Sequence, residues 1–223
     1  MFKSIRKVVL YLFVAHLVYI VALKWINPPF TITQVQQGFE QGKFNRDYIA
    51  YDEMGRNIKL AVIGSEDQKF PVHNGFDMEG IQEAIEKNKE GKKLRGGSTI
   101  SQQVAKNVFL WQGRSWLRKG LEVYFTFMIE KIWSKERILE MYLNTSEMGI
   151  GVFGVEAASE YYFNKPAKDL TKNEAARIAA ALPLPRKYNV NPPSSFISRR
   201  ASHIERQMRN IQGNADLEKV LGE

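Results

Sequence analysis

An acidic residue, Glu66, opens a segment rich in side chains that can do chemistry. Residues 65–75 read SEDQKFPVHNG and follow directly on the apolar run 60–63. An apolar wall disfavours the ionised form of a carboxyl group, so the pKa of Glu66 would rise towards values useful in general acid or base catalysis. The same segment also fits a solvated turn in which Asp67 or His73 caps neighbouring backbone, and composition alone leaves both interpretations open.

A second group of candidates lies in residues 96–103, GGSTISQQ. The glycine pair brings the hydroxyls of Ser98 and Thr99 and free backbone N–H groups to the start of a predicted helix, where anions are attracted. Lys106 follows on that helix and the basic run 92–95 precedes it, a pattern typical of a site for a phosphate-bearing substrate. The segment is not a P-loop, because a glycine stands where the lysine is required, nor a nucleophile elbow, because an isoleucine replaces the final glycine.

A third group consists of Arg114, Arg118, Lys119 and Glu122. On a helix, Arg118 and Glu122 would share a face, and as an exposed pair they would stabilise the helix by only about 0.3–0.5 kcal/mol. Held among cations, the Glu122 carboxylate would instead stay ionised and could orient a substrate hydroxyl or a divalent ion. A simple surface pair is the preferred interpretation of this segment taken alone.

The composition limits what can position these residues. The chain has 223 residues with 44% hydrophobic content, enough for one catalytic domain. The net charge of +8 does not indicate nucleic-acid binding, because half of the excess lies in residues 1–27, which carry four basic and no acidic residues. Cysteine is absent, which excludes disulfides and thiolate metal sites, and the three histidines lack the spacing of a zinc enzyme.

The N-terminal segment is predicted to be a membrane anchor. Residues 8–23 are apolar apart from His16, and extension to Ile26 gives 19 residues, close to the roughly 20 needed to cross a bilayer. No small-x-small cleavage pattern follows, which favours a retained helix over a signal peptide. Positive charges before the span predict a cytoplasmic N-terminus, with the rest of the chain outside the cytoplasmic (inner) membrane. His16 is expected to stay neutral and to bond a helix carbonyl or water.

The chain divides into four predicted parts. Residues 1–27 are a basic tip and anchor, and 28–57 are a linker and entry segment with a short strand at 48–51. Residues 58–212 are a mainly α catalytic domain. The polar tail 213–223 is expected to be loosely ordered.

Caps and apolar periodicity predict the helices of the domain. Trp111 and Trp116 are expected in its core, the alternative being an apolar edge at the bilayer surface. The predicted helices are 77–90, begun by Asp77; 99–111, begun by the capping box Thr99–Gln102; 115–133; 134–143, begun by Ser134; an alanine-rich helix begun by the box Thr171–Glu174; and a last long helix that ends before Gly213. Two of them are predicted to bury an apolar stripe, namely Leu117, Leu121, Tyr124, Met128 and Ile132 in one and Ile197, Ala201, Ile204, Met208 and Ile211 in the other.

Four segments in order, EDQKFPVHNG, GGSTISQQ, RKGLE and KERILEMYLN, resemble the motifs of the peptidoglycan glycosyltransferases. This family includes the polymerase module of bifunctional penicillin-binding proteins, and the resemblance is greatest to its monofunctional biosynthetic transglycosylases. It covers about residues 58–206 and implies a mainly α fold, with a lysozyme-like helical large lobe and a smaller membrane-contacting lobe after one transmembrane helix. Leu121, where some relatives carry a basic residue, and Arg199–Arg200, which keep only part of a fifth motif, depart from the pattern.

The resemblance implies polymerisation of lipid II, a disaccharide-peptide carried on undecaprenyl pyrophosphate, into glycan strands. Glu66 would take the proton from the acceptor's GlcNAc 4-hydroxyl, which attacks C1 of the donor MurNAc with inversion and release of undecaprenyl pyrophosphate. Glu122 would organise the donor site, and Lys106 and Arg114 would hold the pyrophosphate. The sequence requires no cofactor, although Mg²⁺ or Mn²⁺ would share the pyrophosphate charge. Further residues expected to bind substrate or shape the site are Gln102, Gln103, Ser98, Thr99, Arg118 and Lys119.

Two other functions compete with this one. A lysozyme-like cell-wall lytic enzyme has no pyrophosphate to hold, so GGSTISQQ together with Lys106 and Arg114 argues against it. A non-catalytic, membrane-anchored scaffold of cell-wall synthesis predicts that Glu66 is dispensable. The expected partners are lipid II, the growing glycan strand, membrane lipid and proteins of cell-wall synthesis or division, without nucleic acid.

Overall fold

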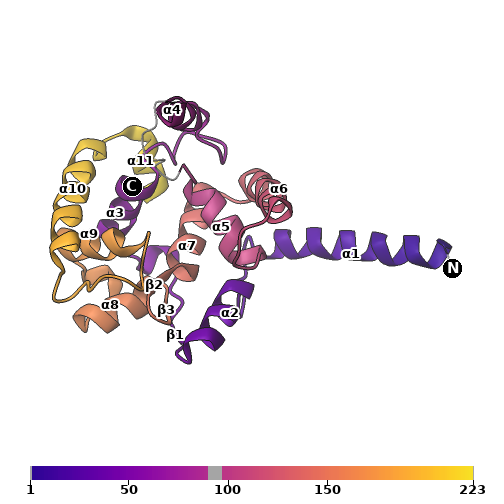
Figure 1. Cartoon of the computed structure of the whole chain (residues 1–223), viewed down its shortest axis with the longest axis horizontal. Helices are drawn as coiled ribbons and strands as arrows, with labels where there is room; N and C mark the ends of the chain where they lie inside the picture. The colour runs from indigo at the N-terminus through magenta and orange to yellow at the C-terminus, as the bar shows by residue number, and fades with distance from the viewer. Residues whose placement is uncertain (1, 90–96, 223) are drawn as a thin grey trace.

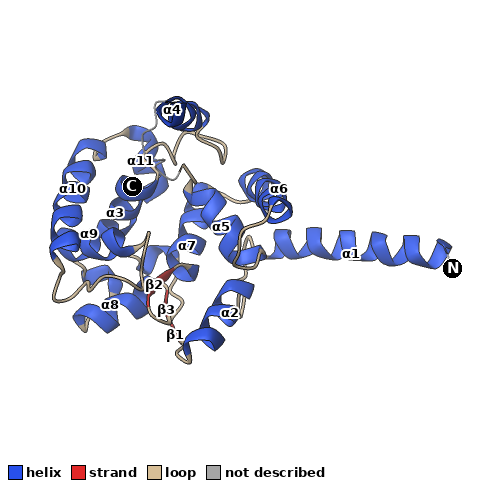
Figure 2. Cartoon of the chain, viewed as in Figure 1, coloured by secondary structure: helices blue, strands red, loops and turns tan. Residues whose placement is uncertain are grey.

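The structure is a computed structural model that describes residues 2–89 and 97–222, and it is mainly helical (Figures 1 and 2). The strands β1 (Asn45–Arg46), β2 (Glu147–Gly149) and β3 (Val152–Phe153) form a small sheet in the order β1-β3-β2, with β1 parallel and β2 antiparallel to β3. The α-helices are α1 (Phe2–Ala22), α2 (Ile32–Gln41), α3 (Arg56–Glu66), α4 (Met78–Lys89), α5 (Ile100–Phe109), α6 (Trp116–Ile132), α7 (Lys135–Thr145), α8 (Val155–Phe163), α9 (Lys172–Ala181), α10 (Ser195–Ile211) and α11 (Ala215–Leu221), and short 3-10 turns cover Tyr51–Glu53 and Ala167–Asp169.

The predicted helix starts are confirmed. Thr99 accepts from the backbone N–H of Gln102 while the Gln102 side chain accepts from the Thr99 N–H, and the box at the start of α9 has the same form. Ser134 caps α7, and Asp77 accepts from the Gly80 N–H at the start of α4. These side chains satisfy amides that a first helical turn leaves unpaired, which is why they fix the helix boundaries.

Helix α3 is the centre of the core. Every residue from 58 to 64 on it is buried, and it packs against α9 and α10. Helix α10 turns the face bearing Ile197, Ala201 and Ile204 inward, as its periodicity predicts. Burial on all sides holds α3 firmly, so the residue at its C-terminal end, Glu66, is held in a defined place.

The stripe predicted for α6 is wrong in detail. Leu117 is 70% exposed, and the fully buried residues of the helix are Glu122, Thr126 and Ile129. Apolar residues occur on several sides of this helix, so periodicity identifies the helix without selecting the face that packs on α5. The core position expected for the two tryptophans is also wrong, because Trp111 is 40% and Trp116 is 93% exposed.

The C-terminal end of α1 is docked on the domain. Ile20 and Leu23 are buried, and Arg137 of α7 donates to the carbonyl of Leu23 at 2.8 and 3.0 Å and to that of Ile26 at 2.9 Å. These carbonyls follow a helix end and lack intrahelical donors, so a guanidinium is well suited to them. The ring of His16 bonds the Tyr124 hydroxyl at 2.7 Å rather than the expected carbonyl or water.

Two expectations about irregular segments are corrected. The strand expected at 48–51 lies instead at Asn45–Arg46, where the backbone can pair with β3. The tail expected to be loose forms α11, because Leu217, Val220 and Leu221 recur at helical spacing and bury one face. An Arg56–Glu218 ion pair at 2.8 Å ties this helix to the start of α3.

We expect Leu217→Ala to lower the free energy of unfolding by about 2–5 kcal/mol, because it leaves a cavity under α11. Lys219→Ala on the same helix, where the side chain is 75% exposed, should change it by less than about 0.5 kcal/mol. Thermal unfolding of the full chain in detergent, followed by circular dichroism, measures both. Equal unfolding temperatures for the two variants would contradict the packing of α11.

Candidate active site

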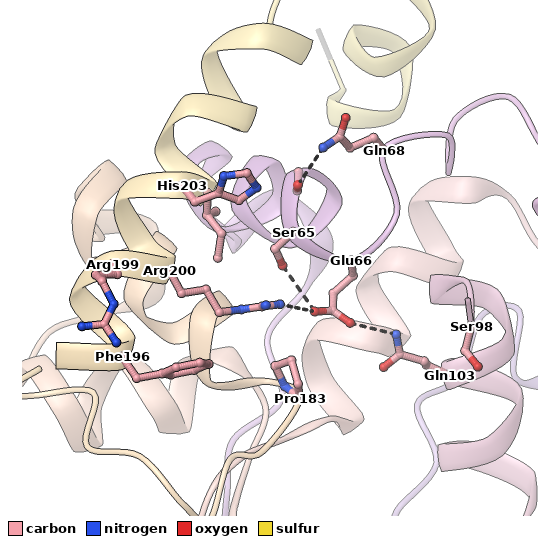
Figure 3. Close-up of a pocket in the computed structure, with 12 residues that line it drawn as sticks. Ser65, Glu66, Gln68, Ser98, Gln103, Pro183, Phe196, Arg199, Arg200 and His203 are labelled. Carbon is pink, nitrogen blue, oxygen red and sulfur yellow. Dashed lines mark hydrogen bonds and ion pairs between the residues drawn. The ribbon is translucent and has the colours of Figure 1, made fainter. Parts of the chain in front are cut away.

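The Glu66 carboxylate lies at the C-terminal end of α3 and faces a cavity (Figure 3). Gln103 of α5 donates through Nε2 to Glu66 Oε2 at 3.1 Å, and the Ser65 hydroxyl lies 3.5 Å from Oε1. Arg200 of α10 places its guanidinium 3.8 Å from Oε1. Three elements far apart in sequence therefore meet at this one carboxylate.

Burial raises the pKa of Glu66 above the ordinary range of a glutamate. The hydrogen bond from Gln103, the charge of Arg200 and the hydroxyl of Ser65 each act in the opposite direction, because they stabilise the ionised form. The carboxylate is thus largely desolvated yet keeps donors on both oxygens. A group in this condition can be ionised near neutral pH and still hold a transferred proton, which suits a general base.

A hydrogen bond from the buried core orients the Gln103 amide. The hydroxyl of Tyr142 on α7, a residue only 1% exposed, donates to Gln103 Oε1 at 3.3 Å. That bond directs the NH₂ group of Gln103 towards Glu66. The chain Tyr142, Gln103, Glu66 therefore fixes the carboxylate from the buried core outward.

Asp67 and His73 form a buried pair beside the catalytic candidate. The Gly75 N–H donates to His73 Nδ1, so the other ring nitrogen, Nε2, donates to Asp67 at 2.9 Å. The same Asp67 oxygen accepts the backbone N–H of Ile100 at 3.0 Å. The capping role considered for this segment is confirmed, but its solvated setting is wrong, because the bonds tie the end of α3 to the start of α5.

The cavity has a volume of about 910 Å³, at the upper end of ordinary ligand sites. Ser98 and Gln103 line one side, and Pro183 closes it below Glu66 in the view of Figure 3. The end of α3 and the turn after it contribute Gly64, Ser65 and Gln68, and another wall comes from α10. The residues of that wall are Phe196, Arg199, Arg200, His203 and Ile204.

A second charged centre lies on α6. Glu122 is buried and accepts from Arg118 at 2.8 Å and from Lys119 at 2.5 Å, one cation on each carboxylate oxygen. The exposed Arg118–Glu122 surface pair that the sequence favours is therefore wrong, because Glu122 is buried and pairs with two cations. Lys106 of α5 is adjacent: burial lowers its pKa, and the charge of Glu122 partly restores it.

Helix α5 joins the two centres. Gln103 and Lys106 are three residues apart, so they lie on the same side of α5, one directed to Glu66 and the other to the Glu122 cluster. A substrate that reaches from Glu66 to the cations would therefore run along one helix. Such a site can activate a hydroxyl at one end and hold an anion at the other.

The remaining predicted residues take other positions. Thr99 and Gln102 are buried, and their side chains are engaged in the capping box and, for Thr99, in a 2.7 Å bond to the Gly75 carbonyl, so they shape the start of α5. Arg114 is exposed in the loop between α5 and α6, and among the described residues no hydrogen bond or ion pair ties it to the cluster. The basic run 92–95 and Gly96 lie outside the described residues.

Sequence reasoning missed the wall from α10 and the support from Tyr142. From sequence, the paired arginines at 199 and 200 indicate only part of a fifth motif, and the pattern assigns them no role. Nothing in local spacing brings residue 200 to residue 66, because their contact arises when α10 packs on α3. The tyrosine looks like an ordinary core aromatic, and only its hydroxyl bond reveals its function.

Comparison with known proteins assigns the chain to a family. The family model described as Transglycosylase matches residues 33–209. Relatives named biosynthetic peptidoglycan transglycosylase include that of Shewanella oneidensis, 45% identical over 223 aligned residues that cover 98% of this chain and 95% of the relative. That of Pseudomonas aeruginosa is 43% identical, covering 96% and 95%, and that of Pasteurella multocida is 47% identical, covering 85% and 80%. The chain therefore belongs to the transglycosylase family, whose domain is a lysozyme-like glycosyltransferase.

Proposed function

We propose that this enzyme polymerises lipid II into glycan strands, with Glu66 as the general base. The Glu66 carboxylate takes the proton of the acceptor's GlcNAc 4-hydroxyl while that oxygen bonds C1 of the donor MurNAc. The bond from C1 to the pyrophosphate oxygen breaks, and the electron pair leaves with undecaprenyl pyrophosphate. The single observation that carries this proposal is a buried carboxylate of raised pKa, held by a neutral donor at the edge of a large cavity.

The cations beside Glu122 have a role in the same reaction. Negative charge builds on the leaving pyrophosphate, and fixed cations stabilise it most where water is displaced. Lys106, Arg118 and Lys119 supply that charge, while Glu122 holds the last two in position at 2.8 and 2.5 Å. Arg114, exposed in the loop before α6, is proposed as a further cation for the pyrophosphate.

Mg²⁺ or Mn²⁺, expected to share the pyrophosphate charge, would be held mainly by oxygens of the pyrophosphate and by water. Such ions prefer several oxygen ligands, but both oxygens of Glu122 are occupied by cations. Within residues 2–89 and 97–222, no group of three or more His, Cys, Asp or Glu side chains gathers to hold a metal.

The anchor places this chemistry at a membrane. One helix in the described part of the chain, Ile5–Ala22, is long and apolar enough to span a bilayer, and only 6% of it is buried in the protein. We propose that its N-terminus is cytoplasmic and that the domain lies outside, because Arg6 and Lys7 lie at the N-terminal end of this helix. Trp116 and Leu117, exposed on the helix that contacts α1, would then meet lipid.

We expect Glu66→Gln to reduce polymerisation of labelled lipid II by about 10²–10⁴-fold, because the amide cannot accept the proton. Glu160→Gln, at an exposed position on α8, is the matched control and should retain full activity. Gel analysis of glycan chains measures the rate. Full activity of Glu66→Gln would refute the mechanism, and release of soluble fragments from finished glycan by the wild type would favour the lytic alternative.

The pH dependence follows from the raised pKa of Glu66. A base acts when ionised, so activity should fall as the pH drops through that pKa. Gln103→Leu removes a donor that lowers this pKa, so the acid limb of kcat/KM should move to higher pH and the rate at neutral pH should fall. Gln82→Leu, on the exposed surface of α4, should leave the profile in place. An unmoved acid limb in Gln103→Leu would show that Gln103 does not act on Glu66.

A further inference from the structure

The wall of the cavity formed by α10 carries positive charge beyond the one guanidinium, that of Arg200, which acts on Glu66. Arg199, Arg200 and His203 line it, and among the described residues that line the cavity Glu66 is the only acidic one. The lining therefore has more cationic than anionic groups. A large cavity with such a wall favours an anionic part of a ligand.

The two arginines are available for binding. No hydrogen bond or ion pair engages Arg199 within the described part of the chain, and Figure 3 shows its side chain beside Phe196, away from Glu66. Arg200 approaches Glu66 only to 3.8 Å, and its Nε atom is buried without a hydrogen-bond partner among the described residues. A buried donor without a partner is costly, so a ligand acceptor at this place would be stabilising.

The position of this wall separates it from the cations on α6. Helix α6 contacts the anchor α1, whereas Figure 1 places α10 at the end of the molecule opposite α1. A pyrophosphate carried on a membrane lipid is expected on the side of the anchor. The anion that meets α10 should therefore be a different group of the substrate, one that extends away from the membrane.

We propose that Arg199, with Arg200 and His203 beside it, binds a carboxylate of the peptide that lipid II carries on its MurNAc. This inference rests on the proposed function, since it deepens the substrate recognition of the same site. The sugar rings are uncharged, but a peptide joined through its amino end keeps a free terminal carboxylate. A guanidinium pairs with a carboxylate through two parallel hydrogen bonds, which makes arginine the suitable residue here.

Arg199, Arg200 and His203 could instead hold a pyrophosphate, because a pyrophosphate, like a carboxylate, is an oxyanion that pairs with a guanidinium. The two sources differ in a way that can be tested. Converting the peptide carboxylates of lipid II to amides removes their charge and leaves the pyrophosphate, the sugars and the peptide length unchanged. A response to amidation that depends on Arg199 therefore reports the peptide.

The test measures polymerisation kinetics of the full chain in detergent with lipid II and with its peptide-amidated form. For the wild type we expect amidation to raise KM about three- to tenfold with little change in kcat. Arg199→Gln should raise KM for lipid II by a similar factor and should be insensitive to amidation. Arg199→Lys should recover part of the loss, and Arg209→Gln, exposed on the same helix and outside the cavity, should behave as wild type.

Each other outcome overturns the inference. If Arg199→Gln raises KM equally for both substrates, the ligand is the pyrophosphate, and if it raises KM for neither, the wall binds no substrate anion. Both results leave the polymerase function intact, because the wild type still makes glycan. Absence of polymer from the wild type with either substrate would instead refute the proposed function itself. Unfolding temperatures of the variants establish that a change in KM does not come from misfolding.

Discussion

Burial of the Glu66 carboxylate is the constraint that organises this structure. A desolvated acid favours its neutral form, and the C-terminal end of a helix adds partial negative charge that acts in the same direction. Ionisation at neutral pH then requires a hydrogen-bond donor and positive charge brought from elsewhere. Gln103 from α5 and Arg200 from α10 supply them, so the packing of both helices around α3 is part of the chemistry as well as of the fold.

Helix α5 contributes residues to both charged centres of the site. Its first turn is fixed by Asp67 through the Ile100 N–H, its middle presents Gln103, and the next turn presents Lys106 to Glu122. A displacement at its start would move both centres together. This explains why a buried Asp67–His73 pair stands where a surface turn would have sufficed for the fold alone.

The sequence predicts this fold well where a local rule decides, and poorly where tertiary contact decides. Capping at Thr99 was predictable because a hydroxyl and a glutamine three residues apart satisfy specific amides. The face of α6 was not, because apolar residues surround that helix and the buried side includes the charged residue Glu122. The candidate site divides in the same way: Glu66 was found from its motif, whereas Arg200 needed the packing of α10 on α3.

The hydrogen bonds from Arg137 to the carbonyls at the end of α1 have a consequence for how the enzyme encounters its substrate. On the proposed membrane anchor, a flexible tether would leave the height and tilt of the domain above the bilayer variable, whereas this joint would fix them. The enzyme and the proposed lipid-borne substrate would then meet by lateral diffusion in two dimensions. Under the proposed function, the quantity that governs turnover would accordingly be the surface density of substrate per area of lipid, and not its concentration in the bulk volume.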